Sequence, residues 1–443
     1  MLENNAIPSG AAYIIKTLLD HGAQAYLVGG CVRDLLLGKT PKEWDITTSA
    51  PPKEVSKLFT KVIPTGIKYG TVTVLLDDGQ YEVTTFRCDE KYVDGRHPSN
   101  VKFTDDIHQD LSRRDFTINA MAYNPSTNEL IDDHAGKIDL EKKIIRTVGQ
   151  PIDRFNEDGL RSIRACRFAA TLNFNIEKET FEAIGKTLKV TKKVAPERIR
   201  DELIKMLAAD KPSIGFELMR QGGLLALFMP ELVACYGVDQ PPQYHKYDVY
   251  WHSLYACDAA PKDNLILRLA ALLHDIAKPK CKKDYTYYNH DIVGMKMAQK
   301  ILKHLHFSSS DTNKIVNLIG NHMFNYTASW GDAAVRRLLV RLGGAENAKD
   351  LFALRQADTK GMEREIESDY LRELQGRIDK IVAEENALHV KDLKISGKDV
   401  MQALKIKPGP EVGKVLQALL EKVLDDPSLN NREALITLIK SHA

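Results

Sequence analysis

The stretch LVGGCVRD at residues 27–34, followed by EWD at residues 43–45, decides the fold of the N-terminal part of this chain. It predicts a strand that ends in a glycine pair, then a helix, and then a second strand that carries two acids. Gly29 and Gly30 have no Cβ, so a phosphate can approach the backbone there, where the helix also points its free N–H groups. Glu43 and Asp45 would project from one strand face and offer the oxygen ligands that Mg²⁺ prefers. A phosphate cradle beside a divalent metal site indicates nucleotidyl transfer.

A third acid, Glu82, lies on the β-branched strand predicted at residues 81–86. Three carboxylates on neighbouring strands could hold two metal ions, one to activate the attacking hydroxyl and one to neutralise the leaving pyrophosphate. The candidate catalytic residues are therefore Glu43, Asp45 and Glu82. Each motif alone also has a plain structural reading, since a glycine pair before a helix is often only a tight turn and acids two residues apart are often a solvated strand face.

Two adjacent arginines, Arg113 and Arg114, follow in LSRRDFTINAMA at residues 111–122. The guanidinium fork binds phosphate oxygens in pairs, which suits a triphosphate. Asp115 could accept hydrogen bonds from the hydroxyls of a ribose. The alternative is a surface cluster of arginine and aspartate without a ligand.

Five motifs occur in order along this chain: GGCVRD, EWDITTSAP, EVTTFR, RRDFTINAMAY and RFNEDGLRSIRACRFA. In them the chain resembles the bacterial (class II) tRNA nucleotidyltransferase and poly(A) polymerase family, from about residue 20 to about residue 205. The resemblance implies an α+β fold, with an N-terminal polymerase-β-like nucleotidyltransferase palm (a mixed sheet with helices) followed by all-α neck, body and tail domains. It also implies Mg²⁺ as cofactor and the addition of C, C and A to tRNA 3′ ends from CTP and ATP.

The resemblance also implies roles for individual residues. The triphosphate would contact Gly29, Gly30 and Arg33, and Asp115 would hold the ribose. The complete set implied to bind the nucleotide is Gly29, Gly30, Arg33, Arg114, Asp115, Asp158, Arg161, Arg164 and Arg167. One position departs from the family, whose metal motif usually begins with aspartate where this chain has Glu43. Because glutamate is one methylene longer, the metal could lie differently here.

The motif EDGLR at residues 157–161 could select the base. Either Glu157 or Asp158 would share a helix face with Arg161. Cytosine and adenine each place an amino donor beside a ring-nitrogen acceptor, which fits a carboxylate next to an arginine, whereas uracil and guanine present the opposite groups and would be rejected. The alternative is an ordinary helix salt bridge worth about 0.3–0.5 kcal/mol. Arg164 and Arg167 continue the basic face toward triphosphate or RNA.

A second group of candidate ligands surrounds LLHDIAKP at residues 272–279. The pattern resembles the HD phosphohydrolase superfamily, whose ligands would correspond to His252, His274, Asp275 and Asp358. His290 and His322 correspond to additional ligands or phosphate contacts in some members. Imidazole with carboxylate suits a divalent transition metal. The implied activity is removal of a phosphate or a 2′,3′-cyclic phosphate from damaged tRNA ends, and the alternative is a scaffold of structural histidines.

The length of 443 residues is too great for a single core. Short β-rich runs give way to amphipathic helices near residue 145, so we expect a nucleotidyltransferase domain at 1–145, a helical neck and body at 146–235, an HD-type domain at 236–370 and a tRNA-binding tail at 371–443. The lysine-flanked Pro-Gly turn near Lys407 could contact RNA phosphates or simply cap a helix.

Composition favours a cytoplasmic enzyme. The six cysteines are scattered without a C-x-x-C pair, which indicates reduced thiols. No apolar run reaches the roughly 18 residues of a membrane span. The net charge of +2 means that any RNA surface must be a local patch. Oligomeric state cannot be read from the chain.

Three alternatives to a CCA-adding activity remain at this stage. An A-adding enzyme that works beside a separate CC-adding partner is not excluded by anything in this sequence. The polar segment from Cys88 to Gln109 is expected to be a flexible loop over the site. In the family that the chain resembles, enzymes that add only CC are shortened here, and the full length of the segment in this chain argues against that activity. A poly(A) polymerase is disfavoured because the last forty residues lack a strongly basic extension. In the third alternative, the HD phosphohydrolase is the main activity and the transferase is a relict. The intact acids and arginines of the transferase motifs argue against it.

Overall fold

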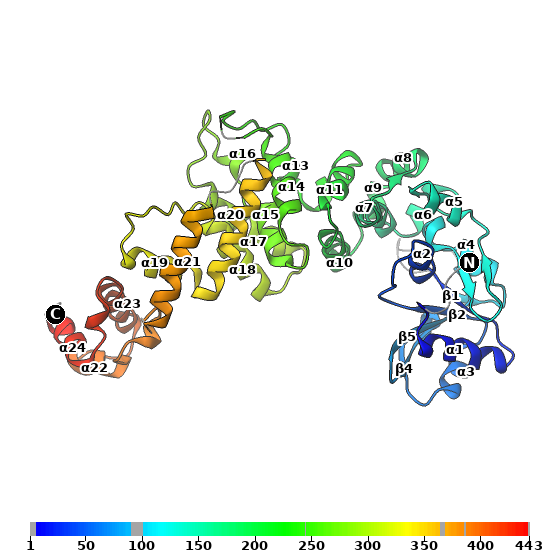
Figure 1. Ribbon diagram of the computed structural model, residues 1–443, viewed down its shortest axis with the longest axis horizontal. Coiled ribbons are helices and arrows are strands. Elements are labelled where there is room, and N and C mark those ends of the chain that lie inside the picture. Colours follow the sequence, from blue (N-terminus) through cyan, green and yellow to red (C-terminus); the bar gives the residue numbers. More distant parts are fainter. Residues whose placement is uncertain (1–5, 90–100, 244, 364–367, 385–386, 442–443) are drawn as a thin grey trace. The chain divides into compact units, whose positions relative to one another are not determined.

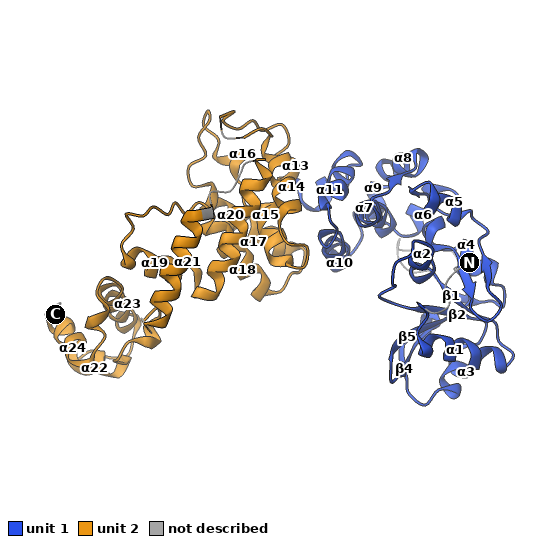
Figure 2. Ribbon diagram, in the orientation of Figure 1, with its two compact units in different colours: residues 1–230 blue, residues 231–443 orange. Residues whose placement is uncertain are grey.

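The first half of the chain is built on one mixed sheet. The structure, a computed structural model, describes residues 6–89, 101–243, 245–363, 368–384 and 387–441 (Figure 1). It divides into two compact units, Met1–Pro230 and Glu231–Ala443 (Figure 2). The sheet lies in the first unit and the second is helical, which confirms the expected α+β class. The finer division into four domains stays a prediction.

The sheet has the strand order β3-β4-β5-β2-β1-β8-β9. Its strands are β1 (Ala25–Val28), β2 (Asp45–Thr48), β3 (Val62–Gly66), β4 (Thr71–Leu76), β5 (Gly79–Thr85), β8 (Ala122–Asn124) and β9 (Glu129–Ile131). Every neighbouring pair is antiparallel except β2 and β5, which run parallel. This parallel pairing places Asp45 directly opposite Glu82.

Helices cover the sheet and continue the first unit. They are α1 (Ser9–Asp20), α2 (Gly30–Leu36), α3 (Pro52–Leu58), α4 (Ile107–Ser112), α5 (Gly136–Glu141), α6 (Pro151–Glu157), α7 (Leu160–Leu172), α8 (Lys178–Lys186), α9 (Leu188–Thr191), α10 (Pro196–Leu207), α11 (Pro212–Gln221) and α12 (Leu225–Phe228). Two further strand pairs join β6 (Arg87–Asp89) to β7 (Val101–Phe103) and β10 (Ile144–Ile145) to β11 (Asn175–Ile176). Proline stands in the first turn of α3, α6, α10 and α11. Its fixed φ suits that position, and the N–H that it lacks would have no partner within the helix there.

Three local expectations were wrong. Glu43 lies in a bend just before β2 and not on the strand. The motif at 157–161 does not lie on one helix, because α6 ends at Glu157 and α7 begins at Leu160. The segment from Cys88 to Gln109 is not simply a loop, since its described ends form β6, β7 and the start of α4; its residues 90–100 lie outside the described part of the chain.

The second unit is a set of packed helices that follows α13 (Pro230–Val233). They are α14 (Val249–Ala259), α15 (Leu265–Leu273), α16 (Lys278–Cys281), α17 (His290–His304), α18 (Ser309–Asn321), α19 (Asp332–Leu342), α20 (Ala348–Gly361), α21 (Ser368–Ala383), α22 (Gly397–Leu404), α23 (Pro410–Asp425) and α24 (Arg432–Ser441). Helix α14 packs against α15 and α20, and α17 packs against α18. A separate apolar core joins α22, α23 and α24. Among the described residues, no helix is long and apolar enough to cross a membrane.

Gly159, which lies between α6 and α7, is closely packed against the backbone of Thr191. A Cβ at this position would lie 2.7 Å from the backbone N and Cα of Thr191. We therefore expect Gly159→Ala to lower the free energy of unfolding by about 1–3 kcal/mol, the usual cost of overpacking, in urea denaturation. The matched control is Gly185→Ala in α8, whose Cβ would have only the Gly222 carbonyl at 3.9 Å. Equal stability of the two variants would contradict this account.

Candidate active site

Two acids face each other across the parallel strands. Asp45 begins β2, Glu82 lies opposite on β5, and both line a cavity of about 210 Å³ together with Arg113 and Arg114. Burial raises the pKa of Asp45, Arg114 opposes this rise, and the negative charges of Glu82 and Glu43 add to it, so that the pKa is about 6. Glu82 and Glu43 are thus close enough to Asp45 to disfavour its negative charge, and a bound cation would relieve that repulsion.

The glycine pair lies at the edge of the same cavity. Gly29 has φ +78°, a conformation that residues with a Cβ rarely adopt, and its N–H donates to the Met121 carbonyl at 3.2 Å. A Cβ on Gly29 would lie 3.2 Å from Nη1 of Arg114 and 4.0 Å from Oδ2 of Asp45. Gly30 is the first residue of α2, and a Cβ there would lie 3.6 Å from Nη2 of Arg33. A side chain at Gly29 would therefore occupy space between Arg114 and Asp45, and one at Gly30 would lie against Arg33.

The two adjacent arginines are held by one carboxylate that the sequence analysis missed. Asp110 is completely buried, and it accepts from Nη2 of Arg113 at 2.7 Å and from Nη2 of Arg114 at 3.1 Å. Burial raises the pKa of Asp110, but the charges of Arg114 and Arg113 outweigh it and lower the pKa. The signal was present in the sequence, since an aspartate in the last turn of a helix can face two arginines that follow it by three and four residues.

Asp115 is paired with an arginine from α7. Its Oδ2 accepts from Nε and Nη2 of Arg164 at 2.7 and 2.6 Å, and its Oδ1 accepts from the N–H of Phe116 at 2.8 Å and from the amide of Asn119 at 3.2 Å. Burial raises the pKa of Asp115, but Arg164 and Arg161 outweigh it and lower the pKa to about 2. Asn119 in turn accepts from Nη1 of Arg33 at 2.8 Å. The predicted ribose and triphosphate contacts therefore belong to one connected network.

The predicted base-selecting residues have other partners in this structure. Asp158 receives two hydrogen bonds from Arg198 of α10, whose Nη1 lies 3.2 Å from Oδ1 and whose Nη2 lies 2.7 Å from Oδ2. Arg161 is buried and pairs with Glu157, and it also donates to the carbonyls of Arg154 and Arg113 at 3.1 and 3.0 Å. The expected pairing of Glu157 with Arg161 therefore forms across the helix break.

Helix α10 also supplies the partner of the remaining arginines. Glu202 is buried, and its carboxylate lies 2.8 Å from Nε of Arg167 and 3.5 Å from Nη1 of Arg164. The guanidinium of Arg167 lies 3.6 Å from the ring centroid of Phe168. The sequence analysis missed Arg198 and Glu202. Their spacing of four residues places them on one helix face, but nothing local indicates which charges they meet.

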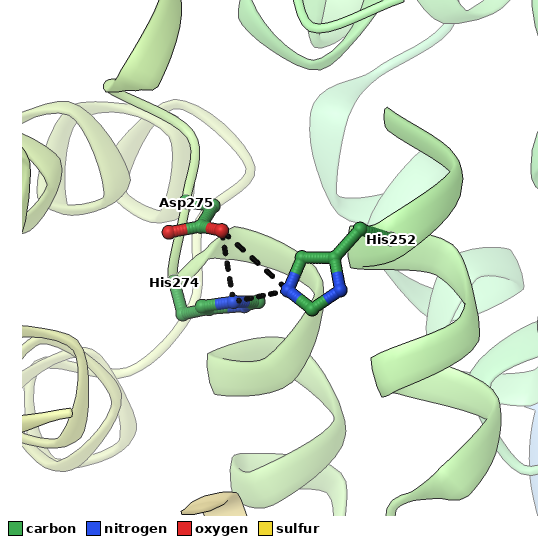
Figure 3. Close-up of side chains that lie close together, drawn as sticks. All are labelled: His252, His274 and Asp275. Carbon is green, nitrogen blue, oxygen red and sulfur yellow. Dashed lines mark hydrogen bonds and ion pairs between the residues drawn. The ribbon is translucent and has the colours of Figure 1, made fainter. Parts of the chain in front are cut away.

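Six predicted ligands converge in the second unit. Figure 3 shows His252 of α14 with His274 and Asp275, which follow α15. Nε2 of His252 lies 3.1 Å from Nε2 of His274. Oδ2 of Asp275 lies 3.5 Å from Nε2 of His252 and 3.2 Å from Nε2 of His274. Asp358 Oδ1 lies 3.0 Å from Nε2 of His252. On the other side of Asp275, Nε2 of His290 lies 3.3 Å from its Oδ1 and 3.2 Å from Nε2 of His322.

The histidine tautomers in this cluster suit a metal. Nδ1 of His274, His290 and His322 each donates to a backbone carbonyl, at 2.7, 2.7 and 2.6 Å. The Nε2 lone pairs are therefore directed toward one another and toward Asp275, an arrangement that a cation stabilises. Lys278, which lies 2.6 Å from Asp275, and Arg355 line the adjoining cavity of about 720 Å³ and were not predicted.

Comparison with known proteins identifies the family. The model described as "Poly A polymerase head domain" matches residues 25–146, and "Probable RNA and SrmB- binding site of polymerase A" matches residues 173–235. A third model, for tRNA nucleotidyltransferase domain 2, matches residues 290–439. The chain is 33% identical over 438 residues to the CCA-adding enzyme of Lactococcus lactis subsp. cremoris (strain MG1363), which covers 96% of this chain and 94% of that protein. The chain belongs to the CCA-adding enzyme family.

Further relatives agree over the whole length. The CCA-adding enzyme of Streptococcus thermophilus (strain CNRZ 1066) is 31% identical over 437 residues, 97% of this chain and 95% of that protein. The crystal structure of Bacillus stearothermophilus CCA-adding enzyme in complex with CTP is 27% identical, with a TM-score of 0.75 over 98% of this chain and 96% of that chain. The predicted family, the nucleotidyltransferase class and the α+β fold are confirmed. The HD resemblance and the individual residue roles stay predictions.

Gly29 offers a direct test of the cavity. We expect Gly29→Ala to reduce nucleotide addition strongly, because the new methyl group would lie against Arg114 in addition to straining a left-handed backbone. Gly38→Ala is the matched control, since Gly38 has φ +68° but nothing within 4 Å of the place that a methyl group would take. Both variants should lose about 1 kcal/mol of stability from strain, whereas only Gly29→Ala should lose activity in a primer-extension assay. Equal activity would refute the proposed closeness of ligand and glycine.

Proposed function

We propose that this chain adds C, C and A to the 3′ end of tRNA, using CTP and ATP, in the cytoplasm. The observation that carries the proposal is the pairing of Asp45 with Glu82 beside Arg113 and Arg114, in a chain whose full-length relatives are CCA-adding enzymes. Those relatives favour CCA addition over A addition alone, poly(A) synthesis or a relict transferase. All six cysteines are free, as expected for a reducing compartment.

Asp45, Glu82 and Glu43 would hold Mg²⁺. Burial, together with the negative charges of Glu82 and Glu43, raises the pKa of Asp45 to about 6 despite Arg114, and a bound cation would offset both effects. When bound, Mg²⁺ supplies positive charge that stabilises the attacking oxygen and the leaving pyrophosphate. Glu43 stands in the bend before β2, close enough for its negative charge to raise the pKa of Asp45.

The arginines bind and orient the triphosphate. Asp110 fixes the guanidinium planes of Arg113 and Arg114, and Asn119 fixes that of Arg33, so these donors need little reorganisation when phosphate arrives. Asp115 already accepts four N–H groups, about the capacity of one carboxylate. A ribose hydroxyl would therefore share or replace one of these bonds, and Asp115 chiefly positions Arg164.

Asp158 and Arg161 would choose the base. A carboxylate accepts from the amino group of cytosine or adenine, and an arginine donates to the adjacent ring nitrogen. Uracil and guanine would set carbonyl oxygen against carboxylate and N–H against guanidinium, which leaves buried polar groups without partners. The protein side chains thus act in place of a nucleic-acid template.

The decisive experiment uses three tRNA transcripts that end at the discriminator base, at C or at CC. Each is incubated with purified protein, Mg²⁺ and CTP, ATP or both, and the products are separated on a sequencing gel. Addition of C, C and A followed by a stop supports the proposal. Extension of the CC-ended transcript alone indicates an A-adding enzyme, a ladder of A residues indicates a poly(A) polymerase, and no extension refutes nucleotide addition.

Removal of one acid tests the metal assignment. We expect Asp45→Ala to lower nucleotide addition by about 10³-fold or more, because the reacting phosphate loses charge stabilisation, while tRNA binding in a filter assay is unchanged. Asp77→Ala, in the exposed turn between β4 and β5, is the control and should keep full activity. Normal addition by Asp45→Ala would rule out the assignment.

A second activity is proposed for the buried cluster of the second unit. His252, His274, Asp275 and Asp358 would hold a divalent transition metal, with His290 and His322 on the other side of Asp275. When bound, such a metal supplies Lewis acidity for phosphoester hydrolysis. Lys278 and Arg355 supply positive charge at the adjoining cavity for a phosphate. The implied substrate is a phosphorylated or 2′,3′-cyclic phosphate tRNA end.

The double variant His274→Ala with Asp275→Ala separates the two activities. It should lose bound metal and any hydrolysis of bis(p-nitrophenyl) phosphate, yet retain nucleotide addition, because the two sites lie in different units. His304→Ala, at the exposed end of α17, is the control. Elemental analysis after dialysis measures the metal. Unchanged metal content and hydrolysis in the double variant would exclude this site.

A further inference from the structure

Arg198 forms the most specific contact that Asp158 makes. Both guanidinium Nη atoms donate to the carboxylate, one to each oxygen, at 3.2 and 2.7 Å. The side chains of Arg198 and Asp158 are 23% and 17% exposed, so water competes only weakly for this pair. The two residues are 40 positions apart and come from α10 and from the junction of α6 and α7. A paired contact of this kind fixes the plane of the carboxylate as well as its position.

The remaining acceptor capacity of Asp158 is small and directed. A carboxylate offers about four acceptor positions. Arg198 uses two of them, and the backbone N–H of Leu160 uses a third by donating to Oδ1 at 3.0 Å. Within the described part of the chain, Oδ2 receives only the bond from Arg198. One acceptor position on Oδ2 is therefore left, enough for a single N–H of an exocyclic amino group.

The arginine also keeps Asp158 an acceptor. A carboxylate that accepts N–H groups on both oxygens has no hydrogen to donate to a carbonyl of the base. Cytosine and adenine bring an amino donor to this position, while uracil and guanine bring a carbonyl oxygen. Against an oriented carboxylate, the carbonyl meets only negative charge.

Helix α10 is well built to hold this orientation. Glu202 lies one turn after Arg198 and binds Arg164 and Arg167 of α7. The same face of α10 therefore contacts α7 through Glu202 and the junction of α6 and α7 through Arg198. Helix α10 also packs directly against α7. The packing of these two helices therefore fixes the position of Arg198 relative to the motif at 157–161.

We infer that Arg198 is a specificity-determining positioning residue, which orients Asp158 so that its one remaining acceptor meets the amino group of cytosine or adenine. The inference rests on the proposed role of Asp158 in base selection. Arg198 itself touches neither the base nor the reacting phosphates. Its loss should relax the choice of base more than it slows addition of the correct nucleotide.

The test compares Arg198→Gln and Arg198→Lys with Arg200→Gln. Arg200 lies two residues further on α10 and pairs with its neighbour Asp201, which makes it a matched control for the loss of one arginine from this helix. The measurements are kcat/KM for CTP and UTP on a tRNA that ends at the discriminator base, and for ATP and GTP on a tRNA that ends at CC.

We expect Arg198→Gln to lower the CTP/UTP and ATP/GTP ratios by about tenfold or more, as for a lost charge-assisted hydrogen bond. Arg198→Lys should recover part of the loss, because an ammonium restores the charge but not the fork. Arg200→Gln should leave both ratios unchanged. A purely structural role would lower the rates with correct and incorrect nucleotides by the same factor and leave the ratios intact, which would overturn the inference.

Asp158→Asn separates failure of the inference from failure of the proposed function. Its amide can donate to a carbonyl, so the ratios should collapse if Asp158 selects the base. Unchanged ratios in Asp158→Asn would refute the role of Asp158 and the inference together. Collapsed ratios in Asp158→Asn with unchanged ratios in Arg198→Gln would refute the inference alone.

Discussion

The first unit depends on arginines that are oriented by buried carboxylates. Asp110 holds Arg113 and Arg114, Asp115 holds Arg164, and Glu202 holds Arg164 and Arg167. Removing one partner of such a pair leaves an uncompensated buried charge and typically costs about 3–5 kcal/mol. The same pairs stabilise the packing of α4, α7 and α10 and prepare the donors for phosphate. Stability and function therefore share these side chains.

The two candidate sites use different ligand chemistry for different surroundings. The acids of the sheet offer oxygen atoms in an open cavity, which suits Mg²⁺ and a substrate that brings its own phosphate oxygens. The helical unit offers buried imidazoles with fixed tautomers, which suit a softer ion held mainly by protein. The acids of the sheet are more exposed than the histidines of the helical unit, because a transferase must admit a triphosphate to its metal.

Local sequence predicted the strand–glycine–helix start, the acids and the two arginines, because each depends on residues close in the chain. It failed at Glu43, where the strand begins two residues later than the acid spacing implied. It also failed at the motif at 157–161, where the extended backbone of Asp158 separates α6 from α7. The pairing of Asp158 with Arg198 could not be predicted either, since only the packing of α10 on α7 brings them together. The histidine cluster was found through resemblance, and its convergence required the fold of the second unit.

The parallel pairing of β2 with β5 has a consequence for synthesis. Its two acids are brought together by a segment that is complete once Thr85 has been made, whereas Arg198 belongs to a helix synthesised more than a hundred residues later. Translation proceeds from the N-terminus, so a nascent chain contains both acids before it contains the arginine that holds Asp158. In the proposed function, the residues that would hold the metal are therefore made before the residue that would sharpen the choice of base.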